Sequence, residues 1–128
     1  MKASINELSK VMDSDEFVIY ETVWGEMHVE YDIFKKRFDV TPFLKGLPND
    51  RDQCPHWGIV LKGQATIMYN GKEEIVKAGD AYYAPPGHTG FFEAGTELWA
   101  RARALIVESS ARLCMRALRK LEALTVLQ

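Results

Sequence analysis

The sequence predicts an all-β fold in which short strands follow one another with tight turns between them. Short segments rich in β-branched and aromatic residues recur along the chain and are bounded by Gly, Pro, Asn or Asp. Polar and apolar residues alternate within several of these segments, as they do in a strand. Asn70-Gly71 is a strong hairpin signal, because both turn positions need a positive φ. We therefore expect one domain over residues 1–128, with a β-barrel core at about 16–108 and short helices at both ends.

A short helix is expected over residues 4–13. Ser4 followed by Glu7 has the form of a capping box. Apolar residues then recur at helical spacing, at Ile5, Leu8, Val11 and Met12. Because a helix this short is marginal alone, it should pack on the barrel or on a partner.

Strands separated by turns are expected next. Their ranges are 17–24, 27–34, 65–69, 72–77, 81–84, 88–93 and 97–107, with a further strand inside 50–63. Residues 35–50 are less regular, and Pro42 and Pro48 mark loop or turn there.

The tail predicts a second helix at about 110–125, with an apolar stripe that includes Cys114. A basic face lies beside the stripe, at Arg112, Arg116, Arg119 and Lys120. Four charges on one helix face are more often solvated surface than a contact for nucleic acid or membrane. The 128-residue chain has a net charge of -2 and a pI of about 5.9, which gives no general reason to bind either.

The composition also bears on location. No apolar run approaches the roughly 20 residues that cross a bilayer. The first residues are polar and charged where a signal peptide would place its apolar segment. We therefore expect a cytoplasmic protein that contacts no membrane, with Cys54 and Cys114 as free thiols.

The stretch from Asp50 to Gly63 carries the chemistry. Asp52, Cys54 and His56 fall at every second residue, so in an extended strand they share one face. Carboxylate, thiolate and imidazole are all metal ligands. The opposite face is apolar, with Trp57, Ile59 and Leu61. We interpret this stretch as the metal-facing strand of the barrel.

Residues 54–90 resemble the two-motif core of the cupin superfamily. Gly63 matches the closing Gly of the first cupin motif, and Gly79, Pro85 and Gly87 match the second. The resemblance implies an antiparallel double-stranded β-helix, or jelly-roll barrel, around a polar lumen. The chain is similar to a subgroup of small single-domain bacterial cupins, but its tail after Trp99 does not resemble that subgroup.

The ligand positions depart from the cupin pattern. His56 stands at the Glu position of the first motif, and Gly90 stands at the His position of the second. His88, two residues before Gly90, keeps the same strand face. The ligands could therefore have moved together along the barrel axis. The candidate metal ligands are Asp52, Cys54, His56 and His88.

Each candidate also has a purely structural interpretation. Cys54 could be a buried thiol and His56 a hydrogen-bonded core residue. His88 could cap the Pro-Pro-Gly turn, and Asp52 could be a turn residue or a hydrogen-bond acceptor for His56. If they do bind metal, a thiolate with imidazoles suits zinc, iron, nickel or copper.

The polar lumen implied by the resemblance suggests further pocket residues. His28 and Glu30 share one face of 27–34, and Tyr83 and Phe91 lie in the later aromatic strands. Polar residues that alternate with apolar ones more often face solvent. Alternation also allows only about half of the aromatic residues in these strands to face the lumen.

Two functions remain open from the sequence. The first is a metal-dependent enzyme that acts on a small molecule, and the second is a non-catalytic module that binds or senses a small ligand or metal. Because Trp57, Ile59 and Leu61 make the outer face of the strand inside 50–63 apolar, that face should be covered, either by the terminal helices or by a second subunit. We expect a homodimer.

Overall fold

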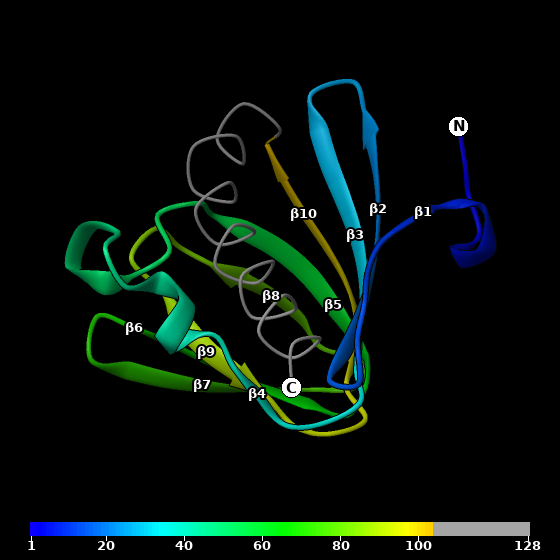
Figure 1. Cartoon of the computed structure of the whole chain (residues 1–128). Helices are drawn as coiled ribbons and strands as arrows, with labels where there is room; N and C mark the ends of the chain where they lie inside the picture. The colour runs from blue at the N-terminus through cyan, green and yellow to red at the C-terminus, as the bar shows by residue number, and fades with distance from the viewer. Residues whose placement is uncertain (104–128) are drawn as a thin grey trace, which may run out of the picture.

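The computed structural model describes residues 1–103, which form two antiparallel sheets facing one another (Figure 1). The six-stranded sheet has the order β1 (Ser9–Asp13), β2 (Phe17–Trp24), β3 (Met27–Phe34), β10 (Glu97–Arg103), β5 (His56–Lys62), β8 (Ala81–Ala84). The four-stranded sheet has the order β4 (Phe38–Asp39), β9 (Thr89–Phe92), β6 (Gln64–Tyr69), β7 (Lys72–Lys77). The predicted all-β class is confirmed.

Local turn chemistry explains two of the hairpins. Asn70 and Gly71 join β6 to β7 with φ angles of 49° and 70°, the left-handed values that this turn requires. Gly25, at φ 60°, lies in the turn between β2 and β3. The β2–β3 pair is in continuous register from Phe17↔Phe34 to Trp24↔Met27. These hairpins supply adjacent strands of each sheet without long connections.

The helix expected over residues 4–13 is wrong. Only a 3₁₀ turn forms there, η1 (Ile5–Glu7), and Ser4 N donates to Glu7 Oε2 at 2.6 Å as a capping box requires. The chain then extends into β1, which pairs with β2 and buries Met12. The free edge of β2 offers a ladder of hydrogen bonds that a marginal helix cannot match. The helix expected at 110–125, with Cys114, lies outside the described residues.

Residues 35–50 are irregular, as expected. They contain β4 and two 3₁₀ turns, η2 (Thr41–Leu44) and η3 (Pro48–Asp50). Leu44 anchors this segment, since it is 1% exposed and reaches the space between the sheets. None of the helical turns among residues 1–103 is long or apolar enough to cross a bilayer.

An aromatic core holds the two sheets together. Phe34 from β3 stacks on Phe92 from β9, with ring centroids 4.2 Å apart and an interplanar angle of 3°. Phe17 and Phe38 extend the cluster, with centroids 5.0 Å apart. The aromatic cluster lies at one end of the space between the sheets, and the polar residues described next lie at the other.

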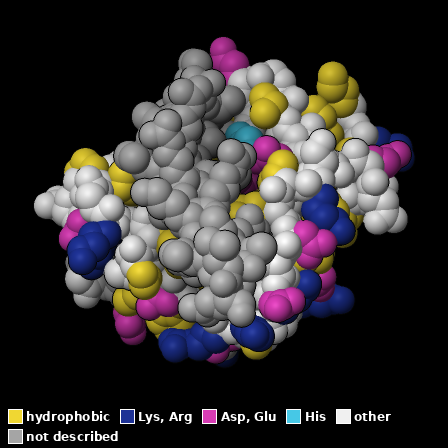
Figure 2. All heavy atoms as spheres, viewed as in Figure 1, with side chains coloured by type: hydrophobic (Ala, Val, Ile, Leu, Met, Phe, Trp, Pro, Cys, Tyr) yellow, Lys and Arg dark blue, Asp and Glu magenta, His cyan; other side chains and the backbone are white. Residues whose placement is uncertain are grey.

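On the face of the molecule in Figure 2, acidic and basic side chains are interleaved rather than gathered by sign.

Candidate functional site

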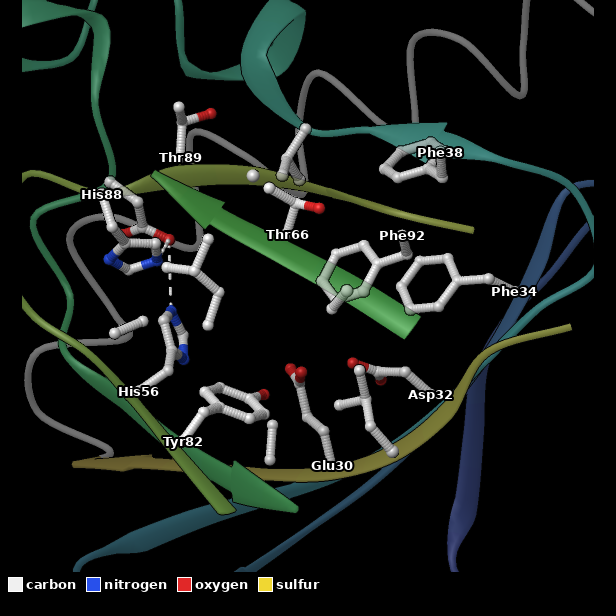
Figure 3. Close-up of a pocket in the computed structure, with 18 of the residues that line it drawn as sticks. Glu30, Asp32, Phe34, Phe38, His56, Thr66, Tyr82, His88, Thr89 and Phe92 are labelled. Carbon is white, nitrogen blue, oxygen red and sulfur yellow. Dashed lines mark hydrogen bonds and ion pairs between the residues drawn. The ribbon is translucent and has the colours of Figure 1, made fainter. Parts of the chain in front are cut away.

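A cavity of about 190 Å³ lies between the two sheets. Its walls come from β2, β3, β5, β8 and β10 on one side, and from β6 and β9 on the other. Figure 3 shows His56 and His88 at one end, Glu30, Asp32 and Tyr82 along one wall, and phenylalanine rings at the far end. The lumen is therefore polar at one end and aromatic at the other.

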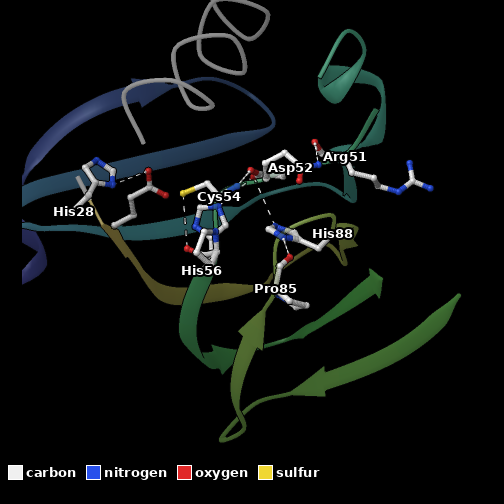
Figure 4. A network of polar contacts seen from close by, with 10 residues as sticks. His28, Arg51, Asp52, Cys54, His56, Pro85 and His88 are labelled. Carbon is white, nitrogen blue, oxygen red and sulfur yellow. Dashed lines mark hydrogen bonds and ion pairs between the residues drawn. The ribbon is translucent and has the colours of Figure 1, made fainter. Parts of the chain in front are cut away.

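Three candidate metal ligands meet at the polar end. One ligand atom from each of Asp52, His56 and His88 lies within 4.8 Å of the other two. Asp52 Oδ2 is 3.2 Å from His56 Nε2 and 3.7 Å from His88 Nε2. Figure 4 shows the three side chains together. The two imidazole rings are nearly perpendicular, with centroids 5.3 Å apart. The carboxylate therefore sits between two imidazole nitrogens.

Backbone pairing brings the two halves of this cluster together. Asp52 and His88 form an isolated antiparallel bridge. Asp52 N donates to His88 O at 2.9 Å, and His88 N donates to Asp52 O at 3.2 Å. His56 begins β5 and pairs with Ala84 of β8. The cluster thus rests on main-chain contacts rather than on a mobile loop tip.

The turn before β9 selects the tautomer of His88. His88 Nδ1 lies 2.7 Å from Pro85 O, and only a protonated Nδ1 can donate to a carbonyl. In the neutral ring, Nε2 is then left with its lone pair facing Asp52. Burial lowers the pKa of His88, although the charge of Asp52 opposes the shift. Burial would raise the pKa of Asp52, but its hydrogen bond with His56 and the nearby imidazoles lower it overall. A neutral imidazole and an ionised carboxylate are the forms that bind metals.

Cys54 lines the same cavity but stands apart from the cluster. It is 2% exposed, and its thiol donates weakly to Pro55 O, with Sγ 3.8 Å from the oxygen. Its backbone N–H donates to Asp52 Oδ1 at 2.8 Å, which helps to hold that carboxylate. Burial, with the charges of Asp52 and Glu30, raises the pKa of Cys54 to about 12. The structure therefore brings together three of the four predicted ligands, while the sulfur of Cys54 is not among the converging atoms.

Gly90, at the position of the second-motif histidine, has no room for a side chain in this structure. A Cβ atom there would lie 2.4 Å from Thr66 O on the adjacent strand β6. A side chain could be added only by separating β9 from β6. The imidazole comes instead from His88, just before β9.

The polar face of β3 points into the cavity rather than to solvent. His28, Glu30 and Asp32 all line it. His28 Nε2 lies 2.8 Å from Glu21 Oε2, and Nδ1 lies 3.5 Å from Glu30 Oε1. The hydrogen bond with Glu21 raises the pKa of His28, against the effect of burial. Glu21, His28 and Glu30 thus form a second group whose possible ligand atoms lie within 4.8 Å of one another. Both nitrogens of His28 lie beside carboxylates, so its ring is held as an ion-pair partner.

The aromatic wall differs from the predicted one by a single residue in each strand. Tyr83 is 48% exposed and stacks on Trp57 outside the sheet, whereas Tyr82 lines the cavity. Phe91 packs beneath Arg37, and Phe92 takes the lining position. The predicted pocket residues Tyr83 and Phe91 are corrected accordingly. Both strands carry adjacent aromatic residues, so alternation alone could not choose between them.

Tyr82 reaches the cavity because Gly58 makes room for it. A Cβ atom on Gly58 would lie 2.5 Å from both Cζ and Oη of Tyr82. Gly58 pairs directly with Tyr82 across β5 and β8. Gly58, which lies opposite Tyr82, is therefore the residue in the sequence that could have indicated which of the two adjacent tyrosines faces the cavity.

Comparison with known proteins agrees with this architecture. Residues 46–96 match the sequence model of the cupin domain. The structure of a cupin resembling RmlC from Shewanella frigidimarina is similar, with a TM-score of 0.58 at 13% identity, covering 80% of this chain and 88% of that one. No curated protein matches the chain.

Two other similar structures carry functional names. The polyketide cyclase RemF from Streptomyces resistomycificus has a TM-score of 0.57 at 12% identity, covering 81% of this chain and 79% of that one. Ferrous HppE has a TM-score of 0.56 at 13% identity, covering 80% of this chain but only 59% of that one. At these identities the likeness is one of fold. Together with the match to residues 46–96, it supports a small cupin-superfamily domain in this chain.

Proposed function

We propose that the cavity holds one divalent transition metal through Asp52, His56 and His88, and that a small molecule binds beside it. The observation that carries this proposal is the convergence of one carboxylate and two imidazoles within 4.8 Å. Two His residues and one carboxylate on one side of an open site are typical of non-haem iron centres. The similar fold of ferrous HppE supports iron as a candidate.

The donor set also bears on metal identity. A site without the sulfur of Cys54 is less soft than a thiolate site, and imidazole with carboxylate suits iron, zinc, nickel or copper. A metal held by three protein ligands keeps positions open, and it could polarise a substrate oxygen or activate water or dioxygen.

The protein residues prepare this site by fixing each donor. Pro85 O orients the ring of His88 through Nδ1, and the backbone N–H of Cys54 orients the carboxylate of Asp52. Partners of this kind hold ligand geometry in known metal sites. The far wall of the cavity is aromatic, so a small molecule beside the metal would contact apolar surface there.

A non-catalytic binding module is the second candidate. The observation that favours it is the size and character of the cavity, which is mostly apolar and has room for a small molecule with or without metal. At about 190 Å³, the cavity is smaller than the roughly 300–1,000 Å³ of pockets that take drug-sized ligands. Turnover of a candidate substrate by the metal-loaded protein, and its absence after chelation, would favour the enzyme.

The metal proposal is tested by titrating chelator-treated protein with Fe(II) under anaerobic conditions and with Zn(II), with bound metal counted by elemental analysis. We expect one metal per chain. His88→Ala and Asp52→Asn should each weaken binding by roughly 100-fold, because each removes a ligand.

Two matched variants serve as controls. His28→Gln removes an imidazole from the second possible ligand group, Glu21, His28 and Glu30, and it should leave metal affinity within about twofold if the metal is held by Asp52, His56 and His88. Cys54→Ser should do the same, and loss of metal in that variant would return the thiol to the ligand set. Unchanged binding in His88→Ala, in protein shown to be folded, would refute the proposed centre.

A further inference from the structure

Asp32 is a buried carboxyl group with an oxygen that has no partner. The residue is 7% exposed, and its Oδ1 has no hydrogen-bond partner among residues 1–103. Such atoms are few in native proteins, because each costs the free energy of its lost hydration. The side chain lies in the cavity wall, and in Figure 3 it points inward beside Glu30. The unpaired oxygen is therefore placed to accept a hydrogen bond from a molecule that enters the cavity.

This wall carries two carboxyl groups, of which Glu30 is paired with His28 at 3.5 Å and Asp32 has no ion-pair partner among residues 1–103. Glu30 and Asp32 lie two residues apart on the inward face of β3. Within the described part of the chain, no Lys or Arg lines the cavity. Burial and the charges of Glu30 and Glu21 raise the pKa of Asp32 well above its usual value. A bound cation would offset this cost, whereas an anion would increase it.

Aromatic rings adjoin the acidic wall. Phe34 follows Asp32 by two residues on the same face of β3 and stacks on Phe92. Figure 3 places Asp32 next to the stacked rings. A molecule that reaches the carboxyl group must therefore also contact apolar surface.

We propose that the cavity recognises a small primary amine with an apolar body, its ammonium group meeting Asp32 and Glu30 and its body packing on Phe34 and Phe92. This inference rests on the proposed function, because it names the class of small molecule that binds beside the metal. An ammonium group has three donors and no acceptor, so it can satisfy both carboxyl groups. A second metal is a poorer occupant, since Asp32 belongs neither to the ligand group of Asp52, His56 and His88 nor to the second possible group among residues 1–103, which is Glu21, His28 and Glu30.

The test compares three probes of similar size that differ in charge: benzylamine, benzyl alcohol and benzoate. Binding is measured by calorimetry and ligand-detected NMR at neutral pH, with chelator present so that no probe can bind through a metal. We expect benzylamine to bind about tenfold more tightly than benzyl alcohol, because it forms charge-assisted hydrogen bonds. Benzoate should not bind at millimolar concentration.

Two variants locate the site. Asp32→Asn should weaken benzylamine about tenfold and leave benzyl alcohol within about twofold. Glu73→Gln, which removes an exposed carboxylate of β7, should change neither probe. If Asp32→Asn does not fold, Glu30→Gln replaces it, and the ranking of probes on the unmodified protein stands in either case.

The inference fails if benzoate binds as tightly as benzylamine, or if benzylamine does not bind at millimolar concentration. It also fails if a folded Asp32→Asn variant binds benzylamine unchanged. If any of these results is found while one metal still binds per chain in the titration above, the amine proposal is refuted and the proposed metal centre is not. If benzylamine binds selectively but no metal is taken up, the proposed metal centre is refuted and the amine proposal is not.

Discussion

His28 shows how one residue can couple the charge state of the cavity to stability. Its ring lies between Glu21 and Glu30, at 2.8 Å and 3.5 Å. The hydrogen bond with Glu21 raises the pKa of His28 in the folded protein above its ordinary value. The folded state therefore binds this proton more tightly than the unfolded chain does. The stabilising contribution is present in full below the unfolded pKa and is lost as the pH rises through the folded pKa.

We therefore expect the stability difference between the unmodified protein and His28→Gln to be largest near pH 5.5 and to shrink toward about pH 8.5. Urea unfolding with chelator present measures this difference. Because every other ionisable group is the same in both proteins, the comparison isolates His28. A difference that stays constant or grows with pH would contradict the ion-pair role.

At the scale of elements, the contacts between strands depend on two glycines for different reasons. Gly71 has a φ of 70°, and a Cβ atom there would meet no other atom within 4 Å, so its role is conformational. Gly90 has no such backbone constraint, but a Cβ atom there would lie 2.4 Å from Thr66 O. The first glycine permits a turn, and the second permits β9 to approach β6.

Alanine substitution should separate these roles. Gly71→Ala should cost about 1 kcal/mol of unfolding free energy, because alanine is strained in the left-handed region. Gly90→Ala should cost roughly 3 kcal/mol, because backbone must move to relieve the overlap. Denaturant titration of both variants measures the costs. Equal costs would show that β9 can shift away from β6 more easily than the contact implies.

Elements with strong local signals could be predicted, and those decided by a neighbour could not. The Asn70-Gly71 turn and the alternation in 27–34 are signals that extend over only a few residues. The hairpin of β6 and β7 and the strand β3 form where these signals predict them. The spacing of Leu8 and Met12 fits one face of a strand as well as of a helix, and pairing with β2 decides for the strand.

The site shows the same limit. Asp52 and His56 both line the cavity as predicted, but residues 53–55 between them are not in a strand, and the bridge to His88 is what positions Asp52. That the sulfur of Cys54 lies beside Pro55 O depends on the irregular chain before β5, where strand alternation no longer controls direction. Asp32 lies on the same face of β3 as Glu30. That face is interior only because the two sheets face one another, and this could not be seen from the strand's own sequence.

At the scale of the whole molecule, the outer face of the six-stranded sheet is unusually apolar. Ile59 and Leu61 of β5 are 47% and 43% exposed among the described residues, and Trp57 stacks on exposed Tyr83 beside them. Trp99 of β10 lies next in this face, with its ring packed on the buried Tyr31 of β3 at a centroid distance of 4.7 Å. Contiguous apolar surface of this kind is typical of protein interfaces.

We propose that a second copy of the chain covers this face. Sedimentation velocity at micromolar concentration should show a dimer, and Leu61→Glu should shift it to a monomer by placing a charge in the contact. Ile75→Glu is the matched control, because Ile75 is a 57% exposed apolar residue of β7 in the other sheet. A monomer before any substitution would rule the dimer out.

The missing side chain at Gly58 has a consequence for altering the ligand range of this protein. Because the phenol of Tyr82 occupies that space, the back wall cannot be thickened by even one methyl group without displacing both the phenol and the carbonyl of Trp99. The cavity can instead be enlarged by replacing Tyr82 with a smaller residue, because the space left by its ring would be bounded by the backbone of Gly58. Engineering toward bulkier compounds should therefore begin at Tyr82 and leave position 58 untouched.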